Sequence, residues 1–216
     1  MNTFSSIKAL RQKYSEEGLD HNNLHTDPLL QFQSWYQQAV DSGIPEPNAM
    51  CLATATLSAA PSQRTVLMKS YDEDGFIFYT NFGSRKSKQM AENNLVSIIF
   101  PWIALHRQVI IEGRVEKIST AESIKYFSTR PRGSKLGAWS SHQSEVLTTR
   151  SLLETKLAQM KNKFAKGDIP LPSFWGGYRV IPVRIEFWQG QQHRLHDRFL
   201  FTLTEERIWN VERLAP

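Results

Sequence analysis

The sequence has 216 residues but only one cysteine, Cys51, so no disulfide can form within the chain. A chain of this kind suits a reducing compartment. Its most apolar stretch, 96–105, is too short to cross a bilayer and contains Pro101. The N-terminus lacks the apolar core of a signal peptide. These absences predict a cytoplasmic protein with no membrane partner.

Several motifs of common chemistry are also missing. There is no G-x-G-x-x-G, Walker loop, C-x-x-C or H-E-x-x-H. His193 and His196 have a spacing seen in metal sites, but Arg194 and Arg198 beside them would repel a cation. Cys51 has no cationic neighbour in sequence that would lower its pKa, which argues against a nucleophilic role. We therefore expect no metal and no cysteine catalysis.

Charge and composition set the broad class. The net charge is +5 with a pI near 9.3, and apolar residues make up 40% of the chain. This balance is ordinary for a globular protein and allows nucleic acid or phosphorylated ligands as partners. The basic residues are dispersed rather than massed in one stripe, which favours discrete anion pockets over nucleic-acid binding. We expect a polar N-terminal segment, 1–26, that is partly mobile, followed by a single domain, 27–216.

The pattern of elements predicts a mainly β fold with added helices. Six or seven strands alternate irregularly with helices, without the rhythm of β-α-β units, which favours an antiparallel barrel. Helices are expected after Asp27-Pro28 and over three further stretches, and the segment 135–144 is expected to be a polar loop or a single turn. The three further helices are predicted over 84–93, 119–129 and 146–165.

The stretch 64–86 is the most informative part of the chain. It reads as two strands joined by the turn 72–75, running into a helix that opens at Ser84-Arg85-Lys86. A helix N-terminus offers free N–H groups and a positive dipole end, and Arg85 and Lys86 add full charges. This combination predicts a site for a phosphate monoester.

Arg64 and Lys69 raise a question of parity. They are five residues apart, so in a regular strand their side chains face opposite sides. Either a bulge brings them together or they serve two different anions. Any one of these cations could be a solvated surface charge, but that interpretation weakens for charges in otherwise apolar strands. The anion-binding candidates near aromatic residues are Arg64, Lys69, Arg85, Lys86, Arg130, Ser134, Arg194 and Arg198.

The chain resembles the pyridoxine/pyridoxamine 5′-phosphate oxidase family of FMN enzymes. The resemblance rests on several motifs in the same order along nearly the whole chain: R-x-x-Y at 11–14, R-x-V-L-x-K at 64–69, Y-T-N-x-x-S-R-K at 79–86, Tyr126 with R-P-R at 130–132, Q-S at 143–144, F-W-Q-G at 187–190, R-L-H-D-R at 194–198 and R-L-A-P at 213–216. The family implies a split-barrel fold and a homodimer with FMN at the subunit interface.

The resemblance also implies roles for particular residues. FMN would be held by Arg64, Thr65, Val66, Leu67, Met68, Lys69, Tyr79, Thr80, Arg85, Lys86, Gln108, Gln143, Ser144, Trp188 and Arg198. The substrate would be held by Arg11, Tyr14, Lys69, Tyr126, Arg130, Ser134, Arg194, Leu195 and His196. Arg194, His196 and Tyr14 would act in catalysis, and the segment 1–26 would cover the active site through Arg11 and Tyr14. On this basis Arg64 would serve the FMN phosphate, and Lys69 would reach toward the substrate.

The implied reaction is the oxidation of pyridoxine or pyridoxamine 5′-phosphate to pyridoxal 5′-phosphate. A hydride would pass to FMN, and O₂ would accept the electrons to give hydrogen peroxide. Two alternatives stay open: a split-barrel FMN oxidase with another substrate, such as a phenazine precursor, and a flavin- or pyridoxal-phosphate-binding module that is not an enzyme. The set Tyr126, Arg130 and Ser134 favours a phosphorylated substrate, because only such a substrate needs a second phosphate site.

Overall fold

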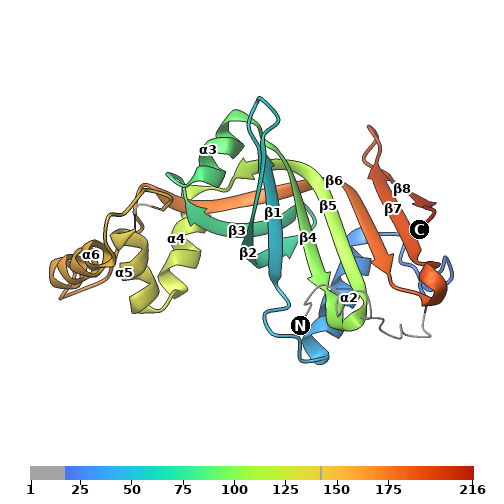
Figure 1. The fold of residues 1–216 in the computed structure, drawn as a ribbon, viewed down its shortest axis with the longest axis horizontal. Coiled ribbons are helices and arrows are strands. Elements are labelled where there is room, and N and C mark those ends of the chain that lie inside the picture. Colours follow the sequence, from blue (N-terminus) through green and yellow to red (C-terminus); the bar gives the residue numbers. More distant parts are fainter. Residues whose placement is uncertain (1–17, 142) are drawn as a thin grey trace, which may run out of the picture. The chain divides into compact units, whose positions relative to one another are not determined.

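The structure, a computed structural model, describes residues 18–141 and 143–216 (Figure 1). None of the helices in these residues has both the length and the apolar character needed to span a membrane. The helices and short 3-10 turns are α2 (Pro28–Asp41), α3 (Arg85–Glu92), η1 (Ile103–Leu105), α4 (Thr120–Thr129), α5 (Arg132–Ser140), α6 (Arg150–Lys163) and η2 (Gln192–Arg194). The strands are β1 (Ala49–Ala55), β2 (Pro61–Asp72), β3 (Gly75–Asn81), β4 (Leu95–Trp102), β5 (Arg107–Lys117), β6 (Trp175–Gln189), β7 (Asp197–Leu203) and β8 (Trp209–Arg213).

The strands of the described chain form an antiparallel barrel with two additional strands. Their order is β3-β2-β1-β4-β5-β6-β7-β8, and β3 also pairs with β6, so the first six strands close on themselves. The mainly β barrel with added helices that the sequence predicts is confirmed. Residue contacts group the chain into two compact units, and β4, β5 and β6 run from one unit into the other. The division into a segment 1–26 and one domain stays a prediction.

The larger unit comprises Asn48–Ile99 and Ile111–Val183. Its β2–β3 hairpin turns at Asp72–Gly75, where the Asp72 side chain accepts a hydrogen bond from the Asp74 N–H at 3.0 Å. A Cβ on Gly75 would lie 2.0 Å from the Val180 carbonyl oxygen, so glycine is required for β3 to pair with β6. Ser84 and Ser119 cap α3 and α4, and Ser119 forms a capping box with Glu122.

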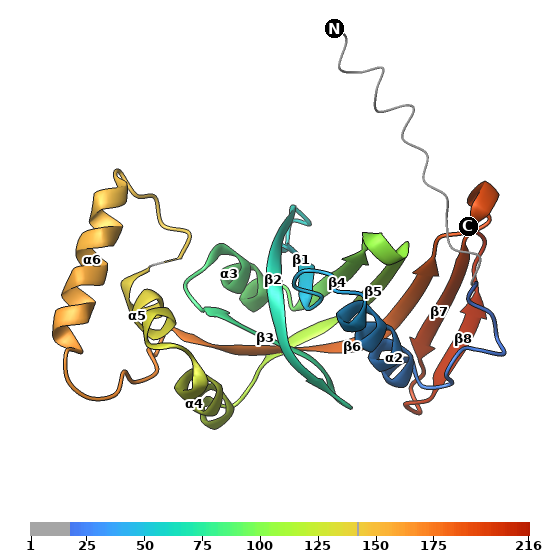
Figure 2. The same cartoon turned by 90° about the horizontal axis from the view of Figure 1, so that it is seen from below.

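The segment after α4 corrects one prediction. Instead of a polar loop or a single turn over 135–144, the chain forms α5, and α4, α5 and α6 gather at one end of this unit (Figure 2). Leu136 is buried against Phe127, Ile169 and Trp175, and this packing stabilises the helix. The two glycines of α5 weaken its intrinsic helix propensity, which is why the sequence pattern reads as a loop.

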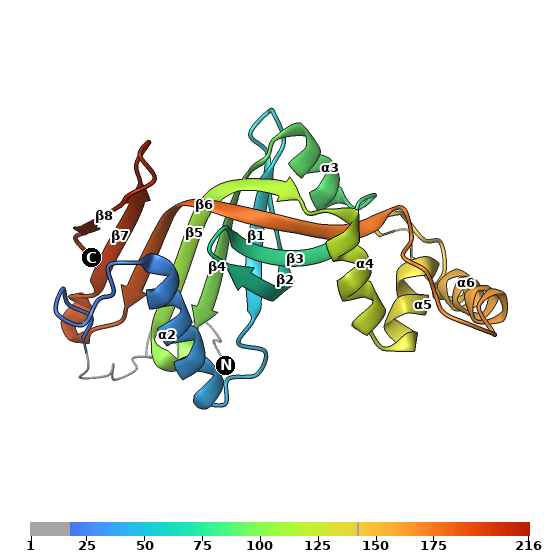
Figure 3. The ribbon, with the colours of Figure 1, turned by 180° about the vertical axis from the view of Figure 1, so that it is seen from behind.

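The smaller unit comprises residues 18–47, Phe100–Ile110 and Arg184–Pro216. Asp27 caps α2 by accepting from the Leu29 N–H at 2.8 Å, and Pro28 occupies the first turn, as predicted. The helix α2 lies against the ends of β4 and β5 that belong to this unit (Figure 3), and its aromatic rings contact rings of β4 and β6. The ring of Phe32 lies 5.0 Å from that of Phe100, and the ring of Trp35 lies 5.3 Å from that of Phe187.

Candidate active site

The larger unit contains a cavity of about 570 Å³ lined mostly by the residues of the 64–86 stretch. Its lining side chains come from β2, β3, α3, α4, the start of β6 and the loop after α5. They are Ser62, Gln63, Arg64, Thr65, Val66, Leu67, Lys69, Tyr79, Thr80, Arg85, Lys86, Tyr126, Arg130, Gln143, Ser144 and Trp175. The structure thus brings together most of the predicted FMN residues with three of the predicted substrate residues.

Arg64 is fixed by the strand next to it. β2 pairs with β1 so that Arg64 lies opposite Leu52, and its Nη1 donates to the Leu52 carbonyl at 3.1 Å and to Thr54 Oγ1 at 2.7 Å. Burial lowers the pKa of Arg64, and the nearby charge of Arg85 lowers it further. A cation held in place beside a second cation favours the binding of an anion.

Lys86 projects from the first turn of α3 and is only 8% exposed. Its Nζ donates to Thr80 Oγ1 at 2.8 Å and to Gln143 Oε1 at 2.8 Å, and Ser84 Oγ lies at 3.3 Å. Burial lowers the pKa of Lys86 to about 8, with a further contribution from the charge of Arg64. No carboxylate takes part in these contacts, so the ammonium charge is solvated here by neutral oxygens only.

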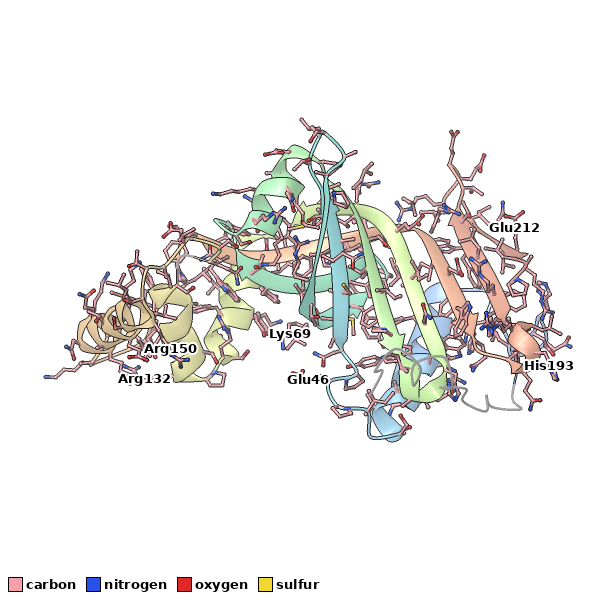
Figure 4. All side chains as sticks on the ribbon, viewed as in Figure 1. Glu46, Lys69, Arg132, Arg150, His193 and Glu212 are labelled. Carbon is pink, nitrogen blue, oxygen red and sulfur yellow. The ribbon has the colours of Figure 1, made fainter. Side chains whose placement is uncertain are left out.

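A β-bulge answers the parity question of Arg64 and Lys69. Met68 pairs with Phe78 and Ser70 pairs with Ile77, so Lys69 is the extra residue on β2. The bulge reverses the alternation after Met68, and Arg64 and Lys69 both line the cavity. Figure 4 shows the Lys69 side chain on β2. Met68 itself is buried in the core and does not line the cavity.

An aromatic stack forms another wall of the cavity. The ring centroids of Tyr79 and Tyr126 are 3.9 Å apart, and those of Tyr79 and Trp175 are 5.4 Å apart, with near-parallel planes. The Arg130 guanidinium lies 4.6 Å from the Trp175 centroid, a cation–π contact. Burial lowers the pKa of Arg130 and raises that of Tyr126.

Arg130 carries an unusual unsatisfied group. Among the described residues, its Nη1 is a buried side-chain nitrogen without a hydrogen-bond partner. Leaving a buried charged donor unpaired is costly, and such a donor in a cavity wall favours an anionic ligand. Ser134, which was predicted beside it, is an exposed residue in the first turn of α5 and does not line the cavity.

The other predicted site residues belong to the smaller unit. They are Gln108, Trp188, Arg194, Leu195, His196 and Arg198. The rings of Trp188 and His196 are 4.6 Å apart. His196 Nδ1 accepts a hydrogen bond from the Gln191 N–H at 3.0 Å, so the neutral imidazole carries its proton on Nε2.

Arg194 and Arg198 differ in their surroundings. Arg194 is exposed, and its φ of 63° places it in the left-handed region, as does the φ of 55° at His193. Arg198 donates to both carboxylate oxygens of Glu186, at 2.8 and 3.0 Å, and this ion pair raises its pKa. An FMN role for Arg198 would thus involve a guanidinium that already has a carboxylate partner.

Some residues that line the cavity were not predicted from the sequence, and two predicted site residues lie outside the part of the chain that the structure describes. Trp175 and Ser62 line the cavity without having been predicted, although Ser62 shares the face of Arg64 two residues along β2. Arg11 and Tyr14 lie outside the described residues. Within residues 18–141 and 143–216, no cluster of three or more His, Cys, Asp and Glu side chains is arranged to hold a metal ion.

The smaller unit has a cavity of its own, of about 860 Å³, which the sequence did not predict. It is lined by residues of α2, the segment before it and the chain from Gln189 to Asp197, including Leu195. Arg107 and Arg213 in its wall are already engaged, Arg107 by Gln189 at 2.7 Å and Arg213 by Asp197.

Comparisons with known proteins agree with these motifs. Residues 36–164 match the family described as pyridoxamine 5′-phosphate oxidase, and residues 175–216 match the family described as the pyridoxine 5′-phosphate oxidase C-terminal dimerisation region. A pyridoxine/pyridoxamine 5′-phosphate oxidase of Rippkaea orientalis is 55% identical over 97% of this chain and 99% of its own length. That of Shewanella oneidensis is 51% identical over 98% of this chain and 100% of its own length.

Solved structures give the same fold. PhzG of Burkholderia lata, in complex with tetrahydrophenazine-1-carboxylic acid, has a TM-score of 0.88 at 27% identity and covers 95% of this chain and 100% of its own. An FMN-binding protein of Nostoc punctiforme related to pyridoxamine 5′-phosphate oxidase has a TM-score of 0.72 at 15% identity, over 89% of this chain and 100% of its own, which shows the fold alone. From the matched domains and the relatives of 51 and 55% identity, the chain belongs to the pyridoxamine 5′-phosphate oxidase family.

Proposed function

We propose that this protein is an FMN-dependent oxidase that makes pyridoxal 5′-phosphate. Pyridoxine 5′-phosphate and O₂ would give pyridoxal 5′-phosphate and H₂O₂. Pyridoxamine 5′-phosphate, O₂ and water would give the same two products and ammonia. The observation that carries the proposal is the pairing of two cationic groups in one cavity of a chain of this family. One group is Arg64 with Arg85 and Lys86, and the other is Arg130 with Lys69 beside the aromatic stack.

The first group fits the phosphate of FMN. The charge of Arg64 helps to lower the pKa of Lys86, and none of the contacts reported above for these two side chains is to a carboxylate. The N-terminus of α3, where the Arg85 N–H donates to Ser144 Oγ at 3.2 Å, adds the positive end of the helix dipole to this group. Gln143, which accepts from Lys86, and Thr80 offer polar atoms for the rest of the cofactor. FMN, when bound, supplies the two-electron redox chemistry that no side chain here provides.

The second group fits the phosphate of the substrate. Arg130 has a buried, unpartnered Nη1, and Tyr126 stacks on Tyr79 beside it. Arginine suits this role because its planar fork matches phosphate oxygens. Tetrahydrophenazine-1-carboxylic acid, the ligand of PhzG, brings one carboxylate charge to a site where Arg130 and Lys69 offer two positive charges, whereas a phosphate dianion matches both. The two cations therefore favour a B6 phosphate over a phenazine precursor as the substrate. Membership of the pyridoxamine 5′-phosphate oxidase family favours an enzyme over a carrier that only binds its ligand.

The proposal includes a homodimer with FMN at the subunit interface, working in the cytoplasm. The matched C-terminal dimerisation region, 175–216, supports a dimer. It also contains Trp188, Arg194, His196 and Arg198. We assign Arg194 to stabilise charge on the substrate's ring hydroxyl. We assign His196, with its proton on Nε2, to orient the ring and assist proton movement.

A direct experiment tests this function. The purified protein is denatured, and the released yellow compound is identified by mass and by comparison with authentic FMN. The holoprotein is then assayed for pyridoxal 5′-phosphate with each B6 phosphate and with unphosphorylated pyridoxine. We expect FMN and turnover of the phosphates only. A colourless protein, or equal turnover of pyridoxine, would refute the proposal.

The depressed pKa of Lys86 predicts how FMN binding depends on pH. Near pH 7 the ammonium is charged and ready to pair with the phosphate dianion. Above about pH 8 the free protein loses this proton, so FMN must bind together with a proton, and its affinity falls by up to about tenfold per pH unit. Titrations of FMN into apoprotein at several pH values measure the slope.

A Lys86→Arg variant is the matched control, since arginine stays charged throughout this range. Its affinity for FMN should change little between about pH 8 and 10. The role assigned to Lys86 would be wrong if wild type and variant showed the same loss.

Arg130→Gln should weaken the binding of the substrate without affecting the binding of FMN. Removal of one charged contact to phosphate costs about 1.5–3 kcal/mol, so KM for pyridoxamine 5′-phosphate should rise by about 10- to 100-fold. FMN content after purification should equal that of wild type. Steady-state kinetics on the holoprotein measure both quantities.

Lys125→Gln removes the same charge from an exposed position on α4 and should leave KM unchanged. If Arg130→Gln lowered FMN content instead of raising KM, Arg130 would belong to the cofactor phosphate.

A further inference from the structure

Gln89 is a buried amide that none of the roles above includes. It lies on α3 with 4% of its surface exposed. Its Oε1 accepts a hydrogen bond from Thr54 Oγ1 at 2.7 Å and from Ser62 Oγ at 2.7 Å. Arg64 Nη2 lies at 3.4 Å from the same oxygen. Three donors from two strands thus converge on one acceptor.

The two hydroxyls connect Gln89 to Arg64. Arg64 Nη1 donates to Thr54 Oγ1 at 2.7 Å, and Nη2 donates to Ser62 Oγ at 2.7 Å. Each hydroxyl has one hydrogen, and because that hydrogen points to Gln89 Oε1, its lone pairs face the guanidinium. The amide oxygen therefore sets the direction of both hydroxyls that hold Arg64.

The orientation of the amide follows from its neighbours. If the amide were turned over, its NH₂ group would face the guanidinium and would offer both hydroxyls a donor instead of an acceptor. The hydroxyls would then have to turn their hydrogens toward Arg64. Only the arrangement with Oε1 inward lets both hydroxyls donate to the amide while each accepts from the Arg64 guanidinium.

Gln89 and Lys86 are three residues apart on α3, so they lie on the same face of the helix. Lys86 lines the cavity and contributes its own charge. Gln89 does not line the cavity, but it contacts Arg64, which does. The helix α3 thereby carries Arg85 and Lys86 and, through Gln89, contacts Arg64, the third cation of the first group. The choice of a neutral amide also matters, because a carboxylate here would pair with Arg64 and compete with a phosphate.

We propose that Gln89 is a positioning residue that holds the Arg64 guanidinium for the flavin phosphate, so that the protein prefers the phosphorylated flavin to riboflavin. This inference rests on the proposed function. Its consequence is specific, because a residue that acts through a phosphate contact must affect the affinity for FMN and leave the affinity for riboflavin unchanged.

The test measures the binding of FMN and of riboflavin to apoprotein by quenching of flavin fluorescence. Gln89→Glu keeps the size of the side chain and adds a charge next to Arg64, while Gln89→Leu removes the acceptor. We expect Kd for FMN to rise by about tenfold or more in Gln89→Glu and by severalfold in Gln89→Leu. Kd for riboflavin should stay within about twofold of wild type in both variants.

Lys88→Gln is the matched control. It lies on the same helix, is exposed, and changes the net charge by the same amount as Gln89→Glu. Its Kd for FMN should stay near that of wild type. If Lys88→Gln and Gln89→Glu weakened FMN equally, the effect would be one of overall charge, and the inference would fail.

A second comparison uses the Arg64→Ala background. If Gln89 acts through Arg64, adding Gln89→Leu to Arg64→Ala should change Kd for FMN by less than about twofold. Equal losses of affinity for FMN and riboflavin, or the full effect of Gln89→Leu on FMN affinity in the Arg64→Ala background, would show that Gln89 has a merely structural role. If wild type itself bound no FMN, the proposed function would fail first. Normal FMN binding by both Gln89 variants would overturn this inference alone.

Discussion

Replacing Arg64 and Lys86 together with alanine should yield a protein that purifies without flavin. Both side chains are held in the cavity by neutral groups, and each charged contact to phosphate contributes about 1.5–3 kcal/mol. Losing both predicts an FMN Kd higher by on the order of 10²–10⁴-fold. Flavin absorbance per mole of purified protein, followed by titration of added FMN, measures the loss.

The control for this double variant is Lys88→Ala with Lys125→Ala, which removes the same charge from exposed positions of the larger unit. It should purify with a full complement of flavin. Riboflavin adds a further check, because its affinity should be nearly the same in wild type and in the Arg64/Lys86 variant. A yellow Arg64/Lys86 variant would show that the flavin phosphate lies elsewhere.

Arg194→Ala and His196→Ala should have the opposite signature: full flavin content and little turnover. Arg194 is exposed and His196 is only partly buried, with its ring tilted against that of Trp188, so neither change opens a cavity in the core. Loss of a group that stabilises developing charge or handles a proton reduces kcat by on the order of 10²-fold or more. Formation of pyridoxal 5′-phosphate at saturating substrate measures kcat.

Arg207→Ala is a close control for Arg194→Ala. Both residues are exposed, and their φ values of 62° and 63° place both in the left-handed region, so the change in backbone strain is the same. Arg207→Ala should keep wild-type kcat. If the purified Arg194→Ala protein were colourless, the roles assigned to the two cationic groups and to Arg194 would be wrong.

The local parts of this account could be predicted from the sequence. The β2–β3 hairpin, the helix that begins after Ser84 and the capping box at Ser119 each depend on residues within a few positions of one another. Local hydrogen bonds and backbone preferences decide such elements, so a short pattern is enough to predict them. The sequence pattern therefore predicts both the cations at 64–86 and the strands and helix that carry them.

Features that depend on distant pairings could not be predicted in the same way. The bulge at Lys69 is defined by the register of β2 against β3, and alternation alone left two possibilities open. The helix α5 depends on the burial of Leu136 among Phe127, Ile169 and Trp175. Its own propensity does not reveal that burial.

Charge partners were hidden for the same reason. Arg198 pairs with Glu186, which lies on the neighbouring strand twelve residues away, so its neutralised state is not visible in the motif that contains it. Gln89 is one of several polar residues of α3, and nothing in the sequence indicates that it contacts Arg64. In both cases the chemistry of an arginine depends on a partner brought near by the fold.

The most direct test of the central claim is to follow O₂ uptake and pyridoxal 5′-phosphate formation in the same reaction of the holoprotein with pyridoxine 5′-phosphate. The two-phosphate site predicts one O₂ consumed for each pyridoxal 5′-phosphate formed, and no uptake with unphosphorylated pyridoxine. An FMN-loaded protein that consumed no O₂ with either B6 phosphate would contradict the account.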